Sequence, residues 1–220
     1  MKLLDKYKYV IWDWNGTIFN DVELCVDVGN NLFKKKNKNT ISVEKYRSIF
    51  TIPVKDYYIA AGFDFSVESF EDIGKEWMDE YEERKFECSL YEHLTSVMEI
   101  FKVNGIDQSV VSAYKQDRLI ELIEEFGLSE YLDHIVGLDN IYAAGKVHLA
   151  KNLINTLGNG EDRKLMIGDT VHDFEVAEEV GADCILIASG HQSKEKLIGT
   201  GVKVYDSMKH FSDMELSVTE

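Results

Sequence analysis

One short segment organises the chain: Tyr9-Val10-Ile11-Trp12-Asp13-Trp14-Asn15-Gly16-Thr17. It is a β-branched and aromatic run that ends on an acid and breaks at once into Asn-Gly. Such a run fits a buried strand, and Asn-Gly is a strong turn signal. Asp13 is therefore predicted to lie at the carboxyl end of a strand. In open α/β sheets that edge is where ligands bind.

The overall charge of the chain narrows the range of partners. Hydrophobic residues make up 45% of the 220 residues and charged residues 29%, which is ordinary for a soluble globular protein. Asp and Glu number 40 against 24 Lys and Arg, so the formal net charge is -16. Binding to phosphate backbones and anionic membranes rests largely on Lys and Arg. We therefore expect neither nucleic acid nor a membrane as partner, and a small anionic substrate needs a local cation.

The cysteines and the first residues indicate a cytoplasmic protein. Cys25, Cys88 and Cys184 are scattered and odd in number, which suggests neither a disulfide framework nor a zinc site. Charges interrupt every apolar pair in the first ten residues, so no signal-peptide core is expected. No apolar run is long enough to cross a bilayer.

Residues from about 20 to 94 show helical patterns and no clear strand, which predicts an inserted helical module. The helices are expected at residues 21–36, 43–50, 54–61, 66–87 and 92–102. An apolar stripe at helical spacing marks the fourth of these. We interpret that stripe as the core of a helical bundle rather than a cofactor site. Its residues are Phe70, Ile73, Trp77, Met78 and Tyr81.

The second half of the chain alternates between strand and helix patterns. Strands are predicted at 108–113, 134–138, 164–168, 183–188 and near 202–205, with helices at 116–126, 145–157 and 174–180. Alternation with apolar strands favours a parallel sheet covered on both faces. The strand before Asp13 belongs to this set, so the fold class is predicted as α/β, a Rossmann-like parallel sheet core with an inserted α-helical cap domain.

Polar residues stand at the ends of separate predicted strands, as a composite active site requires. They are Asp13, Ser112, Lys146, Asp169 and Asp173. Each has an ordinary explanation when taken singly: turn chemistry for Asp13, a solvated residue for Lys146, an N-cap and a first-turn acid for the last two. Spacing alone does not establish such a site, but the physical roles of these residue types fit phosphoryl transfer, where positioning and charge stabilisation dominate.

This order of Asp, Ser, Lys and Gly-Asp-x-x-x-Asp resembles the four motifs of the haloacid dehalogenase-like (HAD) hydrolase superfamily over nearly the whole chain. The break after the first motif is similar to the C1 helical caps of phosphoglycolate-phosphatase and β-phosphoglucomutase relatives. The resemblance implies a core domain of residues 1–18 and 95–220 and a cap domain of residues 19–94. It also implies a Mg²⁺-dependent phosphatase of a small phosphorylated metabolite. Whether the protein is a monomer or homodimer is left open by the sequence.

The resemblance also implies roles for individual residues. Asp13 is the expected nucleophile and carrier of an aspartyl-phosphate. The expected Mg²⁺ ligands are Asp13, the backbone carbonyl of Asn15, Asp169 and Asp173, a hard oxygen set that suits this ion. Lys146 is expected to neutralise the phosphate and the attacking carboxylate. The expected substrate-binding residues are Thr17, Ser112, Ala113 and Lys146, through hydroxyls, loop amides and the ammonium group.

Asn15 departs from the family pattern, because the second acid of the first motif normally serves as general acid and base. An amide can do neither, and such help is typically worth about 10²–10⁴-fold in rate. One alternative is a slow or specialised phosphatase that uses water, His172, His191 or a cap residue. Another alternative is that Asn15 is a deliberate substitution for an original Asp, which would give this same sequence.

Two further alternatives change the reaction or remove it. A phosphonatase-like or phosphotransfer activity would use a cap lysine. The candidates for that lysine are Lys34, Lys35, Lys36 and Lys55. The other alternative is a non-catalytic phosphometabolite-binding protein, and the presence of Asp13, Lys146, Asp169 and Asp173 weighs against it.

Overall fold

A six-stranded parallel sheet forms the centre of the computed structural model, which describes residues 3–143, 145–157 and 162–216. The strand order is β5-β4-β1-β6-β7-β8, and every neighbouring pair is parallel. The strands are β1 (Tyr9–Trp12), β4 (Asp107–Lys115), β5 (His134–Leu138), β6 (Lys164–Gly168), β7 (Asp183–Ile187) and β8 (Lys203–Tyr205). The predicted α/β class is therefore confirmed.

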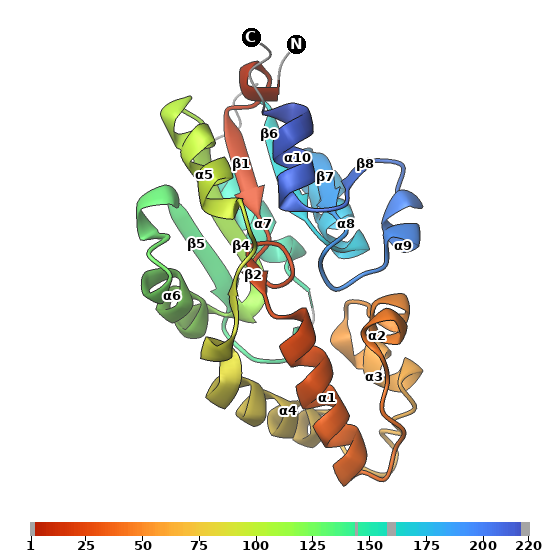
Figure 1. Cartoon of the computed structure of the whole chain (residues 1–220). Coiled ribbons are helices and arrows are strands. Elements are labelled where there is room, and N and C mark those ends of the chain that lie inside the picture. Colours follow the sequence, from red (N-terminus) through yellow and green to blue (C-terminus); the bar gives the residue numbers. More distant parts are fainter. Residues whose placement is uncertain (1–2, 144, 158–161, 217–220) are drawn as a thin grey trace.

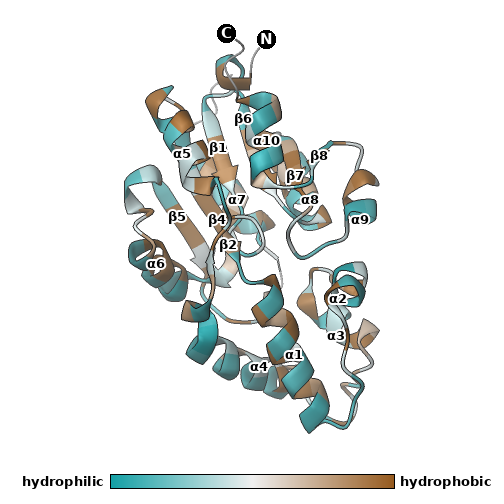
Figure 2. Ribbon diagram, viewed as in Figure 1, coloured by the Kyte–Doolittle hydropathy of each residue, from teal (hydrophilic) through white to brown (hydrophobic). Residues whose placement is uncertain are grey.

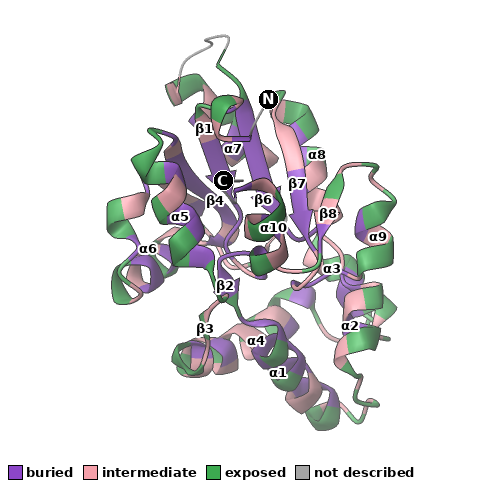
Figure 3. Ribbon diagram, turned by 45° about the horizontal axis from the view of Figure 1, so that its top comes forward, coloured by how far each residue is buried: buried purple, intermediate pink, exposed green. Residues whose placement is uncertain are grey.

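Successive residues of the inner strands enter two separate hydrophobic clusters, one on each face of the sheet. In β1, Val10 and Trp12 join one cluster while Ile11 joins the other. The first face is covered by α5 (Leu94–Val103), α6 (Gln116–Glu125) and α10 (Met208–Glu215), and the second by α7 (Val147–Leu157) and α8 (Val171–Val180). Burial on both faces explains the continuous apolar strands. Figure 2 shows them mostly brown, and Figure 3 shows the buried residues gathered in the sheet.

The register of β1 places Asp13 at the carboxyl edge of the sheet. Trp12 pairs with Val110 on one side and with Ile167 on the other, and the Asp13 backbone N–H donates to the Ile167 carbonyl over 2.9 Å. The chain leaves the sheet immediately after this residue. Asp13 thus lies between the ends of β4 and β6, as its sequence context predicts.

A helical insertion, residues 21–88, lies beyond this carboxyl edge (Figure 1). It contains α1 (Val22–Lys35), α2 (Val43–Ile49), α3 (Val54–Ala60), α4 (Phe70–Arg84) and a 3₁₀ turn at Lys85–Glu87. The hydroxyls of Ser42 and Ser69 cap α2 and α4 by accepting from the third backbone N–H. Ser42 precedes α2 as predicted, whereas α4 begins at Phe70, four residues after its predicted start, because Ser69 caps it there.

The expectation that residues 20–94 contain no strand is wrong at both ends of the insertion. Strand β2 (Phe19–Asn20) pairs antiparallel with β3 (Ser89–Leu90), so the two chain crossings between sheet and insertion run side by side. Strands of two residues carry no alternating pattern, which is why periodicity does not reveal them.

Smaller elements complete the described part of the chain. They are the 3₁₀ turns η1 (Leu3–Asp5) and η3 (Ser129–Tyr131) and the short helix α9 (Lys194–Ile198). Helix α8 begins at Val171, three residues before its predicted start, because Thr170 and Asp173 form a capping box. Among the described residues, no helix combines the length and apolar character that crossing a membrane requires.

Candidate active site

Lys146 connects two of the predicted site acids. Its buried ammonium group contacts the Asp13 carboxylate and lies 2.7 Å from Asp173 Oδ1. Burial alone lowers the pKa of Lys146, but the charges of Asp13 and Asp173 outweigh burial and raise it. For Asp13 burial dominates and raises the pKa, although Lys146 opposes it. Lys146 therefore stays charged in its buried position between Asp13 and Asp173.

Asp13, Asp169 and Asp173 form a buried carboxylate cluster, with one oxygen from each within 4.8 Å of the others. Burial, with the charges of the other two acids, raises the pKa of Asp169 well above its ordinary value. Burial also acts to raise the pKa of Asp173, but Lys146 and Thr170 outweigh it and lower this pKa. Three carboxylates face one ammonium group, so the cluster lacks positive charge. Hard oxygen donors with excess negative charge fit Mg²⁺.

The surrounding backbone fixes Asp169 in place. Its Oδ1 accepts from the Thr17 hydroxyl over 2.9 Å, and its Oδ2 accepts from the His191 backbone N–H over 2.6 Å. A Cβ atom on Gly16 would lie 2.4 Å from Asp169 Oδ2, and one on Gly190 2.2 Å from the same atom. Only glycine leaves room for this carboxylate at both positions, and Gly16 also has a positive φ of 78°.

Ser112 and Ala113 stand where β4 loses its regular pairing. The register between β4 and β5 shifts between Val111 and Lys115, which frees this part of the strand end. The Ser112 hydroxyl accepts from the Tyr114 backbone N–H over 3.0 Å. Ser112 and Ala113 line a cavity together with Asp13 and Lys146. The structure thus brings together Asp13, Ser112, Ala113 and Lys146 from three segments far apart in sequence.

The Asn15 side-chain amide contacts Asp21 and Tyr81. Its Nδ2 donates to Asp21 Oδ2 over 2.7 Å and lies 3.0 Å from the Tyr81 hydroxyl. That hydroxyl also donates to Asp21 Oδ2, over 2.8 Å. Asp21 is 1% exposed and precedes α1, but its carboxylate does not cap that helix. Asn15 and Tyr81 hold it instead.

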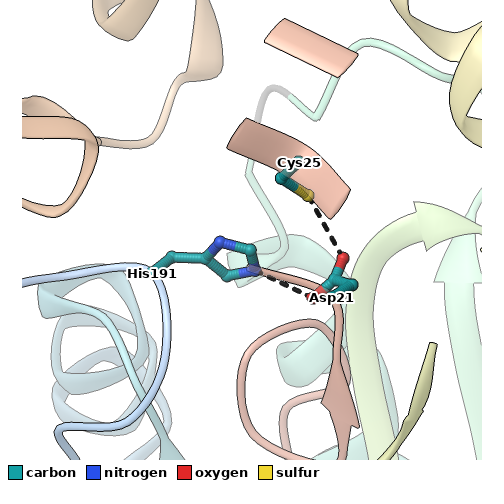
Figure 4. A group of neighbouring side chains, drawn as sticks. All are labelled: Asp21, Cys25 and His191. Atoms are coloured by element: carbon teal, nitrogen blue, oxygen red, sulfur yellow. Dashed lines mark hydrogen bonds and ion pairs between the residues drawn. The ribbon is translucent and has the colours of Figure 1, made fainter. Parts of the chain in front are cut away.

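Asp21 is the centre of a second buried cluster (Figure 4), of which the sequence indicated only His191 as a candidate. His191, from the loop after β7, places Nε2 3.2 Å from Asp21 Oδ1, and its Nδ1 lies 2.8 Å from the Tyr46 hydroxyl. Cys25 on α1 donates from its thiol to Asp21 Oδ2 over 3.4 Å. No sequence motif links these residues, and Asp21 and Cys25 were assigned only to the predicted helix 21–36. The Asp that precedes α1 without capping it is visible only in the fold.

The two charged groups of this second cluster stabilise each other. Burial is the largest influence on the pKa of His191 and lowers it, but the Asp21 carboxylate outweighs burial and raises this pKa to about 9. Burial acts to raise the pKa of Asp21, and His191, Tyr81 and Asn15 together lower it. An imidazolium and a carboxylate therefore lie side by side at neutral pH.

Both clusters open onto one cavity of about 150 Å³ between the insertion and the sheet. The predicted role of the Phe70–Tyr81 stripe as bundle core is incomplete, because four of its five residues line this cavity. The wall from the insertion, beyond α1, has no charged side chain among the described residues. It consists of Tyr46, Phe50, Ile52, Val54, Tyr57, Tyr58, Phe70, Gly74, Trp77, Met78 and Tyr81.

The other predicted candidates lie elsewhere or are occupied. His172 lines the cavity, but its Nε2 accepts from the Lys146 backbone N–H over 3.2 Å and its Nδ1 faces Glu175. Lys35 and Lys36 pair with glutamates of the insertion, and Lys55 lies over the rings of Phe65 and Phe70. Lys34 is exposed near the end of α1. None of these four lysines lines the cavity.

The sequence and the fold are similar to those of known proteins. The family of haloacid dehalogenase-like hydrolases matches residues 10–187 of the chain. Among curated proteins, none matches the sequence of this chain. A predicted phosphatase from Clostridium acetobutylicum is 20% identical, with a TM-score of 0.78 over 96% of this chain and 100% of that chain.

Two further solved structures show how far this likeness reaches. A predicted phosphoglycolate phosphatase from Haemophilus somnus is 17% identical, with a TM-score of 0.73 over 94% of this chain and 97% of that chain. The protein tyrosine kinase A of Mycobacterium tuberculosis is also 17% identical, with a TM-score of 0.80 over 97% of this chain and 100% of that chain. Proteins described as phosphatases and as a kinase share the fold, so the site must decide the chemistry.

Proposed function

This chain belongs to the haloacid dehalogenase-like hydrolases, and from that premise we propose that it is a Mg²⁺-dependent phosphatase of a small phosphorylated metabolite. The observation that carries the proposal is the contact between Asp13 and Lys146 at the foot of a largely apolar cavity. A carboxylate at a strand end, with a buried ammonium group beside it, suits attack on a phosphoryl group that carries negative charge.

In the proposed reaction Asp13 attacks phosphorus and the alcohol oxygen leaves, which forms an aspartyl-phosphate; water then releases phosphate and restores the carboxylate. Lys146 neutralises charge on the transferring oxygens and on Asp13. Asp13, Asp169, Asp173 and the Asn15 carbonyl would hold Mg²⁺. When bound, the ion supplies the positive charge that the carboxylate cluster lacks.

Phosphoryl contacts are assigned to the Ser112 hydroxyl and the Ala113 amide, both at the cavity. Thr17 contributes through Asp169, because its hydroxyl already donates to that carboxylate. It is a positioning residue in this proposal.

Asp21 and His191 are proposed as the proton-transfer pair that replaces the missing acid of the first motif. Asn15 donates to Asp21, six positions later, and in this proposal the Asp21 carboxylate takes the place of the family's second acid. The pair holds one proton at neutral pH. That proton would pass to the leaving alcohol oxygen in the first step and return from the attacking water in the second. The lysines that a phosphonatase-like reaction needs do not line the cavity, which favours the phosphatase.

The uncharged wall of the insertion supports a narrower substrate class. Lys115 and the His191 imidazolium also line the cavity, but Lys115 pairs with Asp117 and His191 pairs with Asp21. A carboxylate or second phosphate on the alcohol would therefore meet an uncharged wall on the insertion side, at a large desolvation cost. We therefore propose a phosphomonoester of a small apolar or aromatic alcohol, which contacts rings such as Trp77 and Tyr57. Phosphoglycolate fits this wall poorly, since its leaving alcohol carries a carboxylate.

The helical insertion acts as the cap in this proposal, with residues 1–18 and 95–220 as the core domain and residues 19–94 as the cap domain. The paired crossings β2 and β3 would form the hinge. Closure over the cavity would exclude water from the phosphoryl site until the aspartyl-phosphate has formed.

Phosphate release with Mg²⁺ tests the proposal directly. Phenyl phosphate and phosphoglycolate are compared with the unmodified protein, with Asp13→Asn and with Asp183→Asn. The last variant makes the same exchange at the opposite edge of the sheet, where Asp183 pairs with Lys6. We expect turnover of phenyl phosphate that Asp13→Asn abolishes and Asp183→Asn retains. Absence of Asp13-dependent turnover on both esters would contradict the phosphatase, and faster turnover of phosphoglycolate would contradict only the substrate class.

A further inference from the structure

The cluster of Asp21, Cys25 and His191 contains one oxygen, one sulfur and one nitrogen donor, unlike the all-oxygen cluster beside it. One ligand atom from each residue lies within 4.8 Å of the others, and all three residues are buried. Soft sulfur and imidazole nitrogen favour zinc-like ions over Mg²⁺. The two neighbouring clusters therefore differ in the ions that they suit.

The spacing of the donor atoms fits a small dication. The Asp21 carboxylate lies 3.4 Å from Cys25 Sγ through Oδ2 and 3.2 Å from His191 Nε2 through Oδ1. Zinc bonds of about 2.0 Å to nitrogen or oxygen and about 2.3 Å to sulfur separate neighbouring tetrahedral ligands by roughly 3.2–3.5 Å. The two distances from the Asp21 carboxylate match this separation, and one donor atom from each residue lies within 4.8 Å of the others.

Two of the candidate ligands are already oriented by a further partner. The Tyr46 hydroxyl meets Nδ1 of His191 and so turns Nε2 toward Asp21. Asn15 and Tyr81 donate to Oδ2 of Asp21, and Oδ1 accepts from the Gly16 backbone N–H and faces the imidazole. Metal-binding histidines commonly use their second nitrogen in this way, because it fixes the orientation of the ring.

We infer that Asp21, Cys25 and His191 form an inhibitory binding site for a zinc-like dication. All three residues line the cavity, which supplies the access route and room for a water as fourth ligand. Binding exchanges charge evenly: the ion enters, the Cys25 thiol and the His191 imidazolium each release one proton, and the cluster keeps its net charge. Coordination would occupy the proton-transfer pair and tie α1 of the insertion to the loop after β7.

Cobalt(II) is the spectroscopic probe for this site, because a cobalt–thiolate bond absorbs in the near ultraviolet. The protein is first saturated with Mg²⁺, so that the carboxylate cluster is filled, and then titrated with Co²⁺. We expect a thiolate band with a one-to-one end point, and its loss when Zn²⁺ displaces Co²⁺. The band should persist in Cys88→Ser and disappear in Cys25→Ser. Cys88 is the matched control because it also lies in the insertion but outside the cluster.

Alkylation makes the test independent of variant folding and of the phosphatase proposal, and a turnover measurement tests the inhibition, which rests on that proposal. In the unmodified protein, Zn²⁺ should slow alkylation of Cys25, read by peptide mass spectrometry, and leave that of Cys88 unchanged. Zn²⁺ should inhibit turnover of the unmodified protein but not of Cys25→Ser. A missing thiolate band, a band that survives in Cys25→Ser, or equal alkylation of Cys25 with and without Zn²⁺ would overturn the inference, whether or not any ester is hydrolysed.

Discussion

The side-chain amide of Asn15 donates a hydrogen bond to Asp21 Oδ2 over 2.7 Å. The two residues thus form an amide–carboxylate pair at the point where the chain enters α1. A carboxylate at position 15 would face a second carboxylate in a buried setting, where like charges repel strongly. Asn15 is therefore explained by Asp21 rather than by loss of the site.

Restoring the family acid with Asn15→Asp should damage the protein. We expect about 2 kcal/mol loss in the free energy of unfolding at neutral pH, because a buried hydrogen bond is replaced by repulsion. Turnover should fall as well. The double variant Asn15→Asp with Asp21→Asn should recover most of the stability, measured by urea unfolding in a double-mutant cycle. A faster Asn15→Asp enzyme would show that position 15 needs no amide.

His191→Gln should change how stability depends on pH. His191 has its pKa raised from 6.5 to about 9 in the folded state. Since the folded protein holds this proton more tightly, the stabilisation is fully present below pH 6.5 and disappears as the pH rises through about 9. The gap in unfolding free energy between the two proteins should shrink by about 3 kcal/mol over this window. Urea titrations at several pH values measure it. His148→Gln, at an exposed position of α7, is the control, and a gap independent of pH would refute the ion pair.

Lys146→Met should leave Asp13 and Asp173 without their buried cation. Loss of one partner from a buried ion pair costs about 3–5 kcal/mol, so the melting temperature should drop clearly. Acidification should restore part of the loss, because the carboxylates then become neutral, and saturating Mg²⁺ should stabilise the variant more than the unmodified protein. Thermal unfolding at two pH values, with and without Mg²⁺, tests this. An unchanged melting temperature would mean that Lys146 does not offset the carboxylates.

Trp77→Ala should distinguish the contribution of the alcohol part of the substrate from that of its phosphoryl group. The indole belongs to the uncharged cavity wall, so its removal should lower kcat/KM for phenyl phosphate by about tenfold, the equivalent of about 1.4 kcal/mol. Hydrolysis of an ester with a very small alcohol, such as methyl phosphate, should change little. Asp79→Ala, at an exposed site of the same helix, serves as control. Equal losses on both esters would place the effect on the phosphoryl site or on folding.

Sequence patterns were sufficient wherever local chemistry determines structure. The runs at His134–Leu138 and Lys164–Gly168 fall on β5 and β6 residue for residue, because buried parallel strands are continuously apolar. Asp13, Lys146 and Asp173 were predicted to meet because parallel strands share one carboxyl edge, and the contacts of Lys146 join them.

What the sequence could not reveal depends on long-range contacts. His191 meets Asp21 across 170 positions of sequence, and no local pattern encodes that meeting. Two-residue strands such as Phe19–Asn20 form only when Ser89–Leu90 lies beside them. The same limit applies to Trp77 and Met78, since a helix side facing a cavity has the same periodicity as one facing a core.

The antiparallel pairing of β2 with β3 brings both ends of the insertion together in a two-stranded sheet of their own. Because the chain enters and leaves the insertion at adjacent positions, another inserted domain could replace it without changing the strand order β5-β4-β1-β6-β7-β8. Ester preference and phosphorus chemistry can therefore diverge separately in evolution. Asp21 and Cys25 are the exception: they lie just inside the exchangeable part, so any replacement would have to rebuild the partners of His191 or lose the proposed proton-transfer pair.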